Sequence, residues 1–188
     1  MKPFIRTFTG LRFYVEDPEP HMIDLRDIVH ANARLCRFNG HVRGWYSVLE
    51  HQVRVSELVA RWGGTRVECL FALHHDSPEM VVGDLASPIK HGTGVREEFC
   101  ALEDEIMRAV CSKFGLPFVE PKIVKDADLV MLATELRDLM NGTEDDCDLP
   151  DPLPECIEPW WHSFWGRLFP FWNAERRFIK RFKQLTGE

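Results

Sequence analysis

Apolar residues recur at intervals of three and four along most of this chain, and this spacing constrains its fold more than any other feature. Such intervals place apolar side chains on one face of an α-helix. Segments that alternate apolar and polar residues, as half-buried strands do, are short. The sequence therefore predicts an all-α fold in which helices pack their apolar faces against one another.

Capping residues and glycines predict where the helices begin and end. Asn39-Gly40 ends the first helix, and capping boxes at 47–50 and 65–68 begin the next two. The expected helical segments are 24–38, 47–62, 65–73, 78–82, 96–114, 121–140 and 178–185. A short N-terminal hairpin is expected before them, over residues 4–14.

The length of the chain, 188 residues, predicts one domain, because it suffices for one core without disulfide bonds. We expect this domain over 1–188, with a helical core at about 22–142. A loop is expected over 143–158, because residues 138–158 include eight acidic residues, three prolines and no basic residue. That composition disfavours both helix and core. An aromatic and basic C-terminal extension follows at 159–188.

The C-terminal extension is rich in tryptophan, with Trp160, Trp161, Trp165 and Trp172. A cluster as dense as this is most often part of a packed core or of a subunit interface. We therefore expect these rings in the core or between the subunits of a homo-oligomer, either a dimer or a hexamer. The basic helix that follows is expected to present a solvated face.

Charge and composition exclude several classes of partner. The net charge of −7 argues against a broad basic surface for long nucleic acid. No apolar run approaches the roughly 20 residues that cross a bilayer, and no signal peptide is recognisable at the N-terminus. The six cysteines form no C-x-x-C pair. We expect a cytoplasmic protein whose partner is a small molecule, with no membrane and no long nucleic acid.

Four residues of the kind that bind transition metals lie next to apolar residues on the predicted helices. They are His51, His75, Asp76 and Asp128. A buried, unpaired carboxylate is costly, and a divalent cation offsets that cost. Two imidazoles and two carboxylates suit Zn, Mn, Fe, Co or Ni and leave positions open for water and substrate. The set therefore predicts a catalytic metal site.

The order of these four residues is similar to the H…HD…D pattern of the HD-domain phosphohydrolases. The segment H-D-S-P-E-M-V-V-G-D-L-A-S-P-I-K, which begins at His75, looks like the deoxynucleotidase branch of that superfamily. Further segments resemble bacterial and phage members that include the phage dATP triphosphohydrolases: R-F-N-G-H, Y-S-V-L-E-H, F-G-L-P and K-D-A-D-L-V-M-L-A-T-E. The resemblance covers about residues 5–140 and implies a helical HD-domain bundle.

The resemblance implies a role for each matching residue. The four residues named above would hold the catalytic ion, taken as Zn, Co or Mn, and a second Mg, Mn or Co could accompany the substrate phosphates. Glu79 would position or deprotonate the attacking water, and Asp84 would meet the sugar or assist a second ion. Arg37 would bind phosphate, and Lys90 would add a second positive contact. His74 precedes the ligand His75 and is expected to pack or to support it.

These roles predict a metal-dependent phosphohydrolase of 2′-deoxynucleotides in the cytoplasm of a bacterial or phage-infected cell. The resemblance favours a dATP or dNTP triphosphohydrolase that releases deoxynucleoside and triphosphate. A 5′-deoxynucleotidase that removes the phosphate of dNMPs is the nearest alternative, and an HD phosphodiesterase or nuclease is the second. A non-catalytic protein whose ion only holds helices together is a further alternative, although such a site has no need of Glu79.

Overall fold

The computed structural model describes residues 2–92, 94, 96–140 and 149–188, and it is mostly helical, as predicted. Its helices are α1 (Leu25–Asn32), α2 (Val48–Arg61), α3 (Arg66–His74), α4 (Glu79–Val82), α5 (Ser87–Gly92), α6 (Arg96–Phe114), α7 (Lys122–Leu139), α8 (Phe164–Leu168) and α9 (Pro170–Thr186). The described residues also form the short 3-10 helices η1 (Pro20–Met22), η2 (Arg37–Gly40) and η4 (Trp160–His162).

The predicted hairpin is present at the N-terminus. Strands β1 (Ile5–Arg6) and β2 (Arg12–Phe13) are antiparallel, with Ile5 opposite Phe13. Gly10 in the connecting turn has a φ of 88°, a conformation that glycine adopts without steric cost. Phe13 is fully buried, so the hairpin is anchored to the helical body by this side chain.

The two predicted capping boxes have different outcomes. At α3 the box is complete, because the Thr65 hydroxyl accepts from the Glu68 amide and the Glu68 carboxylate accepts from the Thr65 amide. At α2 the Ser47 hydroxyl accepts from the Glu50 amide at 3.1 Å, but Glu50 does not return to Ser47. Its carboxylate accepts from the Arg54 guanidinium instead. Both helices nevertheless begin where the sequence predicts.

The first helix is shorter than predicted, because α1 ends at Asn32 and the expected continuation to residue 38 does not occur. After α1 the backbone pairs with the segment before α2. The amide of Arg37 donates to the carbonyl of Tyr46 at 2.9 Å, and the amide of Val48 donates to the carbonyl of Leu35 at 3.0 Å. These bonds replace the helical ones and direct the buried Arg37 side chain toward the core.

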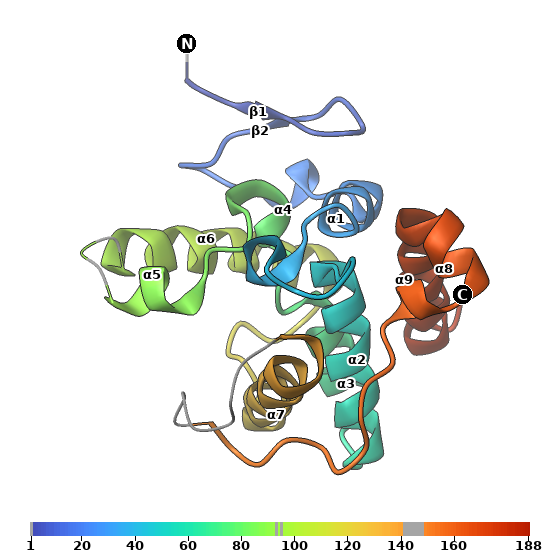
Figure 1. The fold of residues 1–188 in the computed structure, drawn as a ribbon. Helices are drawn as coiled ribbons and strands as arrows, with labels where there is room; N and C mark the ends of the chain where they lie inside the picture. Colours follow the sequence, from blue (N-terminus) through green and yellow to red (C-terminus); the bar gives the residue numbers. More distant parts are fainter. Residues whose placement is uncertain (1, 93, 95, 141–148) are drawn as a thin grey trace.

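Helix α2 lies at the centre of the molecule and packs against α3, α7 and α9 (Figure 1). The main core fills the space between these four helices and contains Leu49, Leu58, Leu73, Met131 and Phe178. A smaller core lies beneath the hairpin, where α1 meets α6, around Phe13, Ile28 and Ile106. Because α2 is enclosed on several sides, the polar residues of its first turns are held inside the protein.

The structure describes only the second half of the predicted acidic loop. Residues 143–148 lie outside the described residues, and 149–159 form neither helix nor strand. The expectation that this segment stays out of the core is wrong for Leu153 and Ile157, which are buried. The amide of Leu153 donates to the Thr134 hydroxyl at 2.9 Å, which ties the segment to α7.

The C-terminal extension places its aromatic residues in two environments. Phe178, Phe182 and Leu185 on α9 are buried against the body, as their spacing predicts. Trp165 and Trp172 are 59% and 54% exposed, so they do not lie in the core of this chain, and their expected place in a subunit interface stays a prediction. Among the described residues, no helix is both long and apolar enough to span a membrane.

Candidate metal centre

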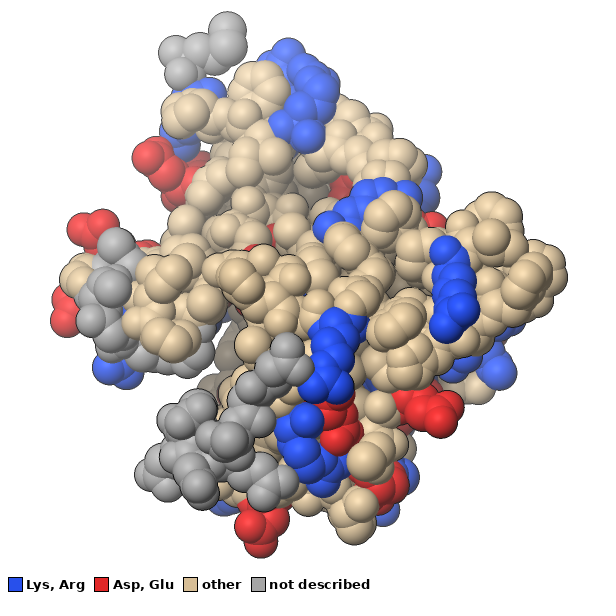
Figure 2. Space-filling view, viewed as in Figure 1, with Lys and Arg blue, Asp and Glu red and all other residues tan. Residues whose placement is uncertain are grey.

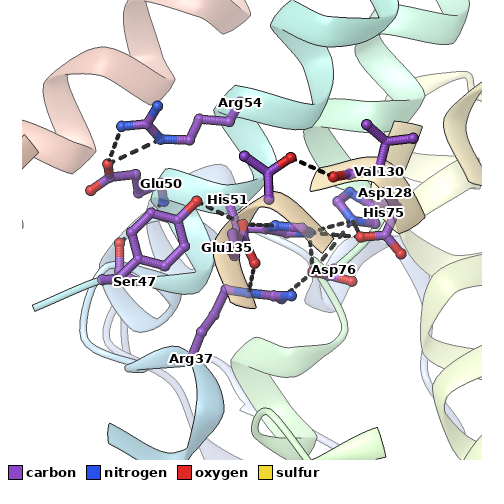
Figure 3. Close-up of polar contacts among 12 residues, drawn as sticks. Arg37, Ser47, Glu50, His51, Arg54, His75, Asp76, Asp128, Val130 and Glu135 are labelled. Atoms are coloured by element: carbon purple, nitrogen blue, oxygen red, sulfur yellow. Dashed lines mark hydrogen bonds and ion pairs between the residues drawn. The ribbon is translucent and has the colours of Figure 1, made fainter. Parts of the chain in front are cut away.

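Two histidine rings from different helices meet inside the protein. His51 lies in the first turns of α2 and is fully buried, and His75 is the residue directly after α3. Their Nε2 atoms are 3.2 Å apart, and Figure 3 shows the two rings directed toward the same point. The packing of α2 on α3 thus brings together two nitrogens that lie 24 positions apart in sequence.

Two carboxylates complete this group. Asp76 Oδ2 lies 3.5 Å from Nε2 of His51 and 3.3 Å from Nε2 of His75. Asp128, on α7, has its Oδ1 at 2.9 Å and 3.7 Å from the same two nitrogens. The ligand atoms of His51, His75 and Asp76 all lie within 4.8 Å of one another, a possible metal-binding triad that Asp128 flanks. The four residues that the sequence predicts are therefore brought together.

The site is closed on the histidine side and open on the carboxylate side. The His75 side chain is 5% exposed, whereas the side chains of Asp76 and Asp128 are 20% and 34% exposed. Two imidazoles and two carboxylates match the ligands of divalent transition ions, and two carboxylates balance a charge of +2. The residues present therefore fit such an ion, with access for a small molecule from solvent.

The charges of the site hold protons on the histidines when no cation is bound. Burial alone would lower the pKa of His75, but Asp76 and Asp128 outweigh it and raise that pKa to about 9. Burial likewise opposes ionisation of Asp128, yet bonds from both histidines keep its pKa well below the ordinary value. Protons and a cation consequently compete for the same nitrogens.

Glu79 lies in the first turn of α4, three residues after Asp76. Burial and the charges of Asp76 and Asp84 raise its pKa well above the ordinary value, while Arg37 opposes the shift. Its Oε2 atom is buried and bonds to none of the described residues. An acid with a raised pKa and a free oxygen is suited to exchange a proton with water.

Arg37 is buried at the edge of the metal centre. Its Nη1 donates to Asp76 Oδ2 at 3.4 Å, and its Nε donates to Glu135 Oε2 at 3.1 Å. The side chain predicted to bind phosphate therefore lies beside the Asp76 carboxylate of the possible metal-binding triad. Its guanidinium is already shared between two carboxylates, which the sequence did not predict.

Asp84 and Lys90 are the two other residues predicted to bind substrate. Asp84 follows α4 in a loop, and burial raises its pKa although Arg37 opposes the shift. Lys90, on α5, forms an ion pair with Glu103 of α6 and lies 5.7 Å from the centre of the Phe99 ring. The contacts of Lys90 are thus with α6, and its proposed phosphate contact stays a prediction.

Glu135 is the residue of the site that sequence reasoning missed. It is fully buried on α7, and its carboxylate contacts His51, Arg37 and Tyr46 (Figure 3). A signal was available, because Glu135 follows Asp128 by seven residues, which is two helical turns and therefore the same face. Nothing in that spacing shows which ring the face meets.

Behind the metal centre lies a set of buried polar residues. The Asn32 amide donates to the backbone carbonyl of Asp76 at 3.0 Å and to Gln52 at 3.2 Å. His74 stacks on Phe114 with ring centres 4.2 Å apart, and its Nδ1 lies 3.0 Å from the Ser77 hydroxyl. These contacts fit the packing role expected of His74.

Two known proteins are similar to this chain in sequence. No protein-family model matches the chain. The uncharacterized protein YfdR of Escherichia coli is 39% identical over 137 residues, which cover 72% of this chain and 72% of YfdR. An uncharacterized protein of Rhodobacter capsulatus is 37% identical over 161 residues, which cover 79% of this chain and 81% of that protein.

Proposed function

The chain belongs to the same family as the Escherichia coli protein YfdR, and we propose that it is a metal-dependent phosphohydrolase of small 2′-deoxynucleotides. One observation carries the proposal: two histidines and two aspartates, from α2, α7 and the turn after α3, converge near a half-buried glutamate, and its buried Oε2 has no partner among the described residues. The similarity of this residue order to HD-domain phosphohydrolases supports the choice of substrate class.

In the proposed reaction His51, His75, Asp76 and Asp128 hold a divalent ion, taken as Zn, Co or Mn. When bound, such an ion supplies Lewis-acid chemistry toward phosphorus and lowers the pKa of water. Glu79 takes the proton of the attacking water, because burial and the charges of Asp76 and Asp84 raise its pKa and so make its carboxylate a stronger base than an exposed glutamate.

The chain's remaining residues orient the substrate. Arg37 contacts Asp76 through one N–H group and Glu135 through another. A guanidinium has five N–H donors, so a phosphate bound beside the exposed carboxylates can accept from the others. Asp84 lies near enough to Arg37 for their charges to interact, and the proposed role of Asp84 is a hydrogen bond to the sugar. Both proposed contacts, to the phosphate and to the sugar, are made to a single small nucleotide.

The pairing of cations around the site favours one phosphate over three. A triphosphate carries several negative charges and needs several free cations. Of the two cations proposed to bind phosphate, Arg37 shares its charge with Asp76 and Glu135, and Lys90 shares its charge with Glu103. We therefore favour a 5′-deoxynucleotidase that acts on dNMPs over the triphosphohydrolase that the resemblance favoured.

The two other classes of function receive less support. A nuclease needs a basic track for a long polyanion, and on the face seen in Figure 2 the Lys and Arg side chains are interspersed with acidic and other residues. A purely structural ion has a closed ligand set. Here the Asp128 side chain is 34% exposed, and Oε2 of Glu79 has no hydrogen-bond partner among the described residues. Both observations favour a catalytic site.

A substrate panel tests the proposal. The protein loaded with Mn, Co, Zn or Mg is incubated with deoxynucleoside mono-, di- and triphosphates and with the corresponding ribonucleotides, and the released product is identified. Orthophosphate from dNMPs is the expected result. Release of triphosphate from dATP would show that the protein is a triphosphohydrolase instead. If no nucleotide is hydrolysed with any of the ions, the proposal is overturned.

A further inference from the structure

The Glu135 carboxylate uses both of its oxygens inside the protein. Its Oε1 lies 2.6 Å from Nδ1 of His51 and accepts from the Tyr46 hydroxyl at 2.7 Å. Its Oε2 accepts from Nε of Arg37 at 3.1 Å. The side chain is completely buried, so water does not substitute for any of these partners.

The chemistry of a carboxylate decides which nitrogen of His51 carries hydrogen. An ionised carboxylate only accepts hydrogen bonds, so the nitrogen at 2.6 Å from it must be the donor. Nδ1 of His51 therefore carries a proton, and the lone pair of a neutral ring is on Nε2. That atom is the one that faces His75 and Asp128.

The same helix contacts His51 at both nitrogens. From α7, Asp128 reaches Nε2 at 2.9 Å and Glu135 reaches Nδ1 at 2.6 Å. The seven-residue spacing places both carboxylates on one face, and the ring lies between them. A rotation of the ring that moved Nε2 away from the ion would break the bond to Glu135.

We infer that Glu135 is a positioning residue that holds His51 with Nε2 directed at the metal and, through Arg37, couples the phosphate contact to the same carboxylate. This inference rests on the metal centre of the proposed function. Tyr46 supports it, because its buried hydroxyl donates to Glu135 and so keeps Oε1 in place. Mutation of a residue that hydrogen-bonds a metal ligand typically weakens metal affinity by roughly 10- to 100-fold.

Two variants and one matched control test the inference. Glu135→Gln keeps the shape but places an amide N–H opposite either His51 or Arg37, both of which need an acceptor. Tyr46→Phe removes only the donor to Oε1. Glu50→Gln is the control, since Glu50 is also a buried carboxylate, is adjacent to His51 in sequence and has its own arginine partner, Arg54.

The readouts are zinc affinity by chelator competition and the long-range proton–nitrogen spectrum of the histidine rings in the zinc-loaded protein. We expect Glu135→Gln to weaken zinc binding by roughly 10- to 100-fold and to shift or remove the Nδ1–H signal of His51. Tyr46→Phe should weaken binding a few-fold and shift the same signal. Glu50→Gln should retain the wild-type values of both.

The outcomes separate this inference from the proposed function. If folded Glu135→Gln binds zinc as tightly as wild type with an unchanged His51 spectrum, the inference is overturned and the metal centre stands. If Glu135→Gln does not fold, an unchanged spectrum and affinity in Tyr46→Phe overturn it instead. If the wild-type protein binds no divalent ion, both the proposed function and the inference fail.

Discussion

Asp128 and Glu135, two turns apart on α7, contact opposite nitrogens of the same His51 ring. One helix face thus supplies both a predicted ligand, Asp128, and the carboxylate that contacts the other ring nitrogen of a second predicted ligand, His51. Because α7 packs directly on α2, the position of this ring depends on the register between the two helices. Changes at this contact should therefore affect ion binding before they affect the overall fold.

Loss of Asp128 should abolish turnover and weaken metal binding while the helices persist. Its side chain is partly exposed, so Asp128→Ala leaves no large cavity, but it removes a charge that faces both histidines. The nucleotide assay measures turnover, isothermal titration with Zn or Co measures metal binding, and far-UV circular dichroism measures the helices. Asp126→Ala, an exposed aspartate on the same helix, is the matched control, and normal activity in Asp128→Ala would show that the fourth ligand is wrong.

Glu79→Gln should lower kcat by roughly 100-fold or more, because the amide cannot take a proton from water. Metal affinity and KM should change little, since Glu79 is not in the ligand triad. Steady-state kinetics on metal-saturated enzyme measure this. The exposed Glu98→Gln variant, on α6, is the control. Full turnover in Glu79→Gln would assign the proton transfer to another group.

Arg37→Ala should destabilise the protein by about 3–5 kcal/mol, because it leaves the buried Glu135 without its arginine partner and removes one of the donors around Asp76. Urea unfolding of the metal-free protein measures the loss. Arg34→Ala removes an arginine that pairs with Glu175 nearer the surface, where a loss of about 1 kcal/mol or less is expected. Equal losses in the two variants would show that the Arg37 pairs contribute no more than a surface pair.

The stability of the metal-free protein should fall in mild acid because of His74. Burial first, and the charge of His75 second, lower the pKa of His74 to about 3. In the unfolded chain its pKa is about 6.5. The folded state thus favours the neutral ring, and the stability this gives is complete above pH 6.5 and is lost as the pH falls toward 3.

His74→Leu should remove this pH dependence. Between pH 6 and pH 4 the wild type should lose up to about 1.4 kcal/mol more per pH unit than the variant. Urea unfolding at several pH values, with chelator present, measures both slopes. Parallel slopes would mean that His74 takes up no extra proton on unfolding.

Several features of the fold follow from short-range sequence signals. The segments 96–114 and 121–140 are predicted within one residue of α6 and α7, because their apolar spacing and capping residues act locally. The end of α1 is predicted wrongly, because backbone bonds between 35–37 and 46–48 compete with the helix. This competition depends on which segments of the chain lie side by side in the folded protein, and a local sequence pattern does not predict that.

By itself the sequence determined the helical class, the order of the helices and the residue types at the metal centre, since spacing and capping operate within a few turns. Only the tertiary structure decided that Glu135 meets His51 across 84 positions and Arg37 across 98. Periodicity shows which face of a helix is buried. The partner of that face is set by how helices distant in sequence pack, and a buried charge is stable only next to the partner that this packing provides.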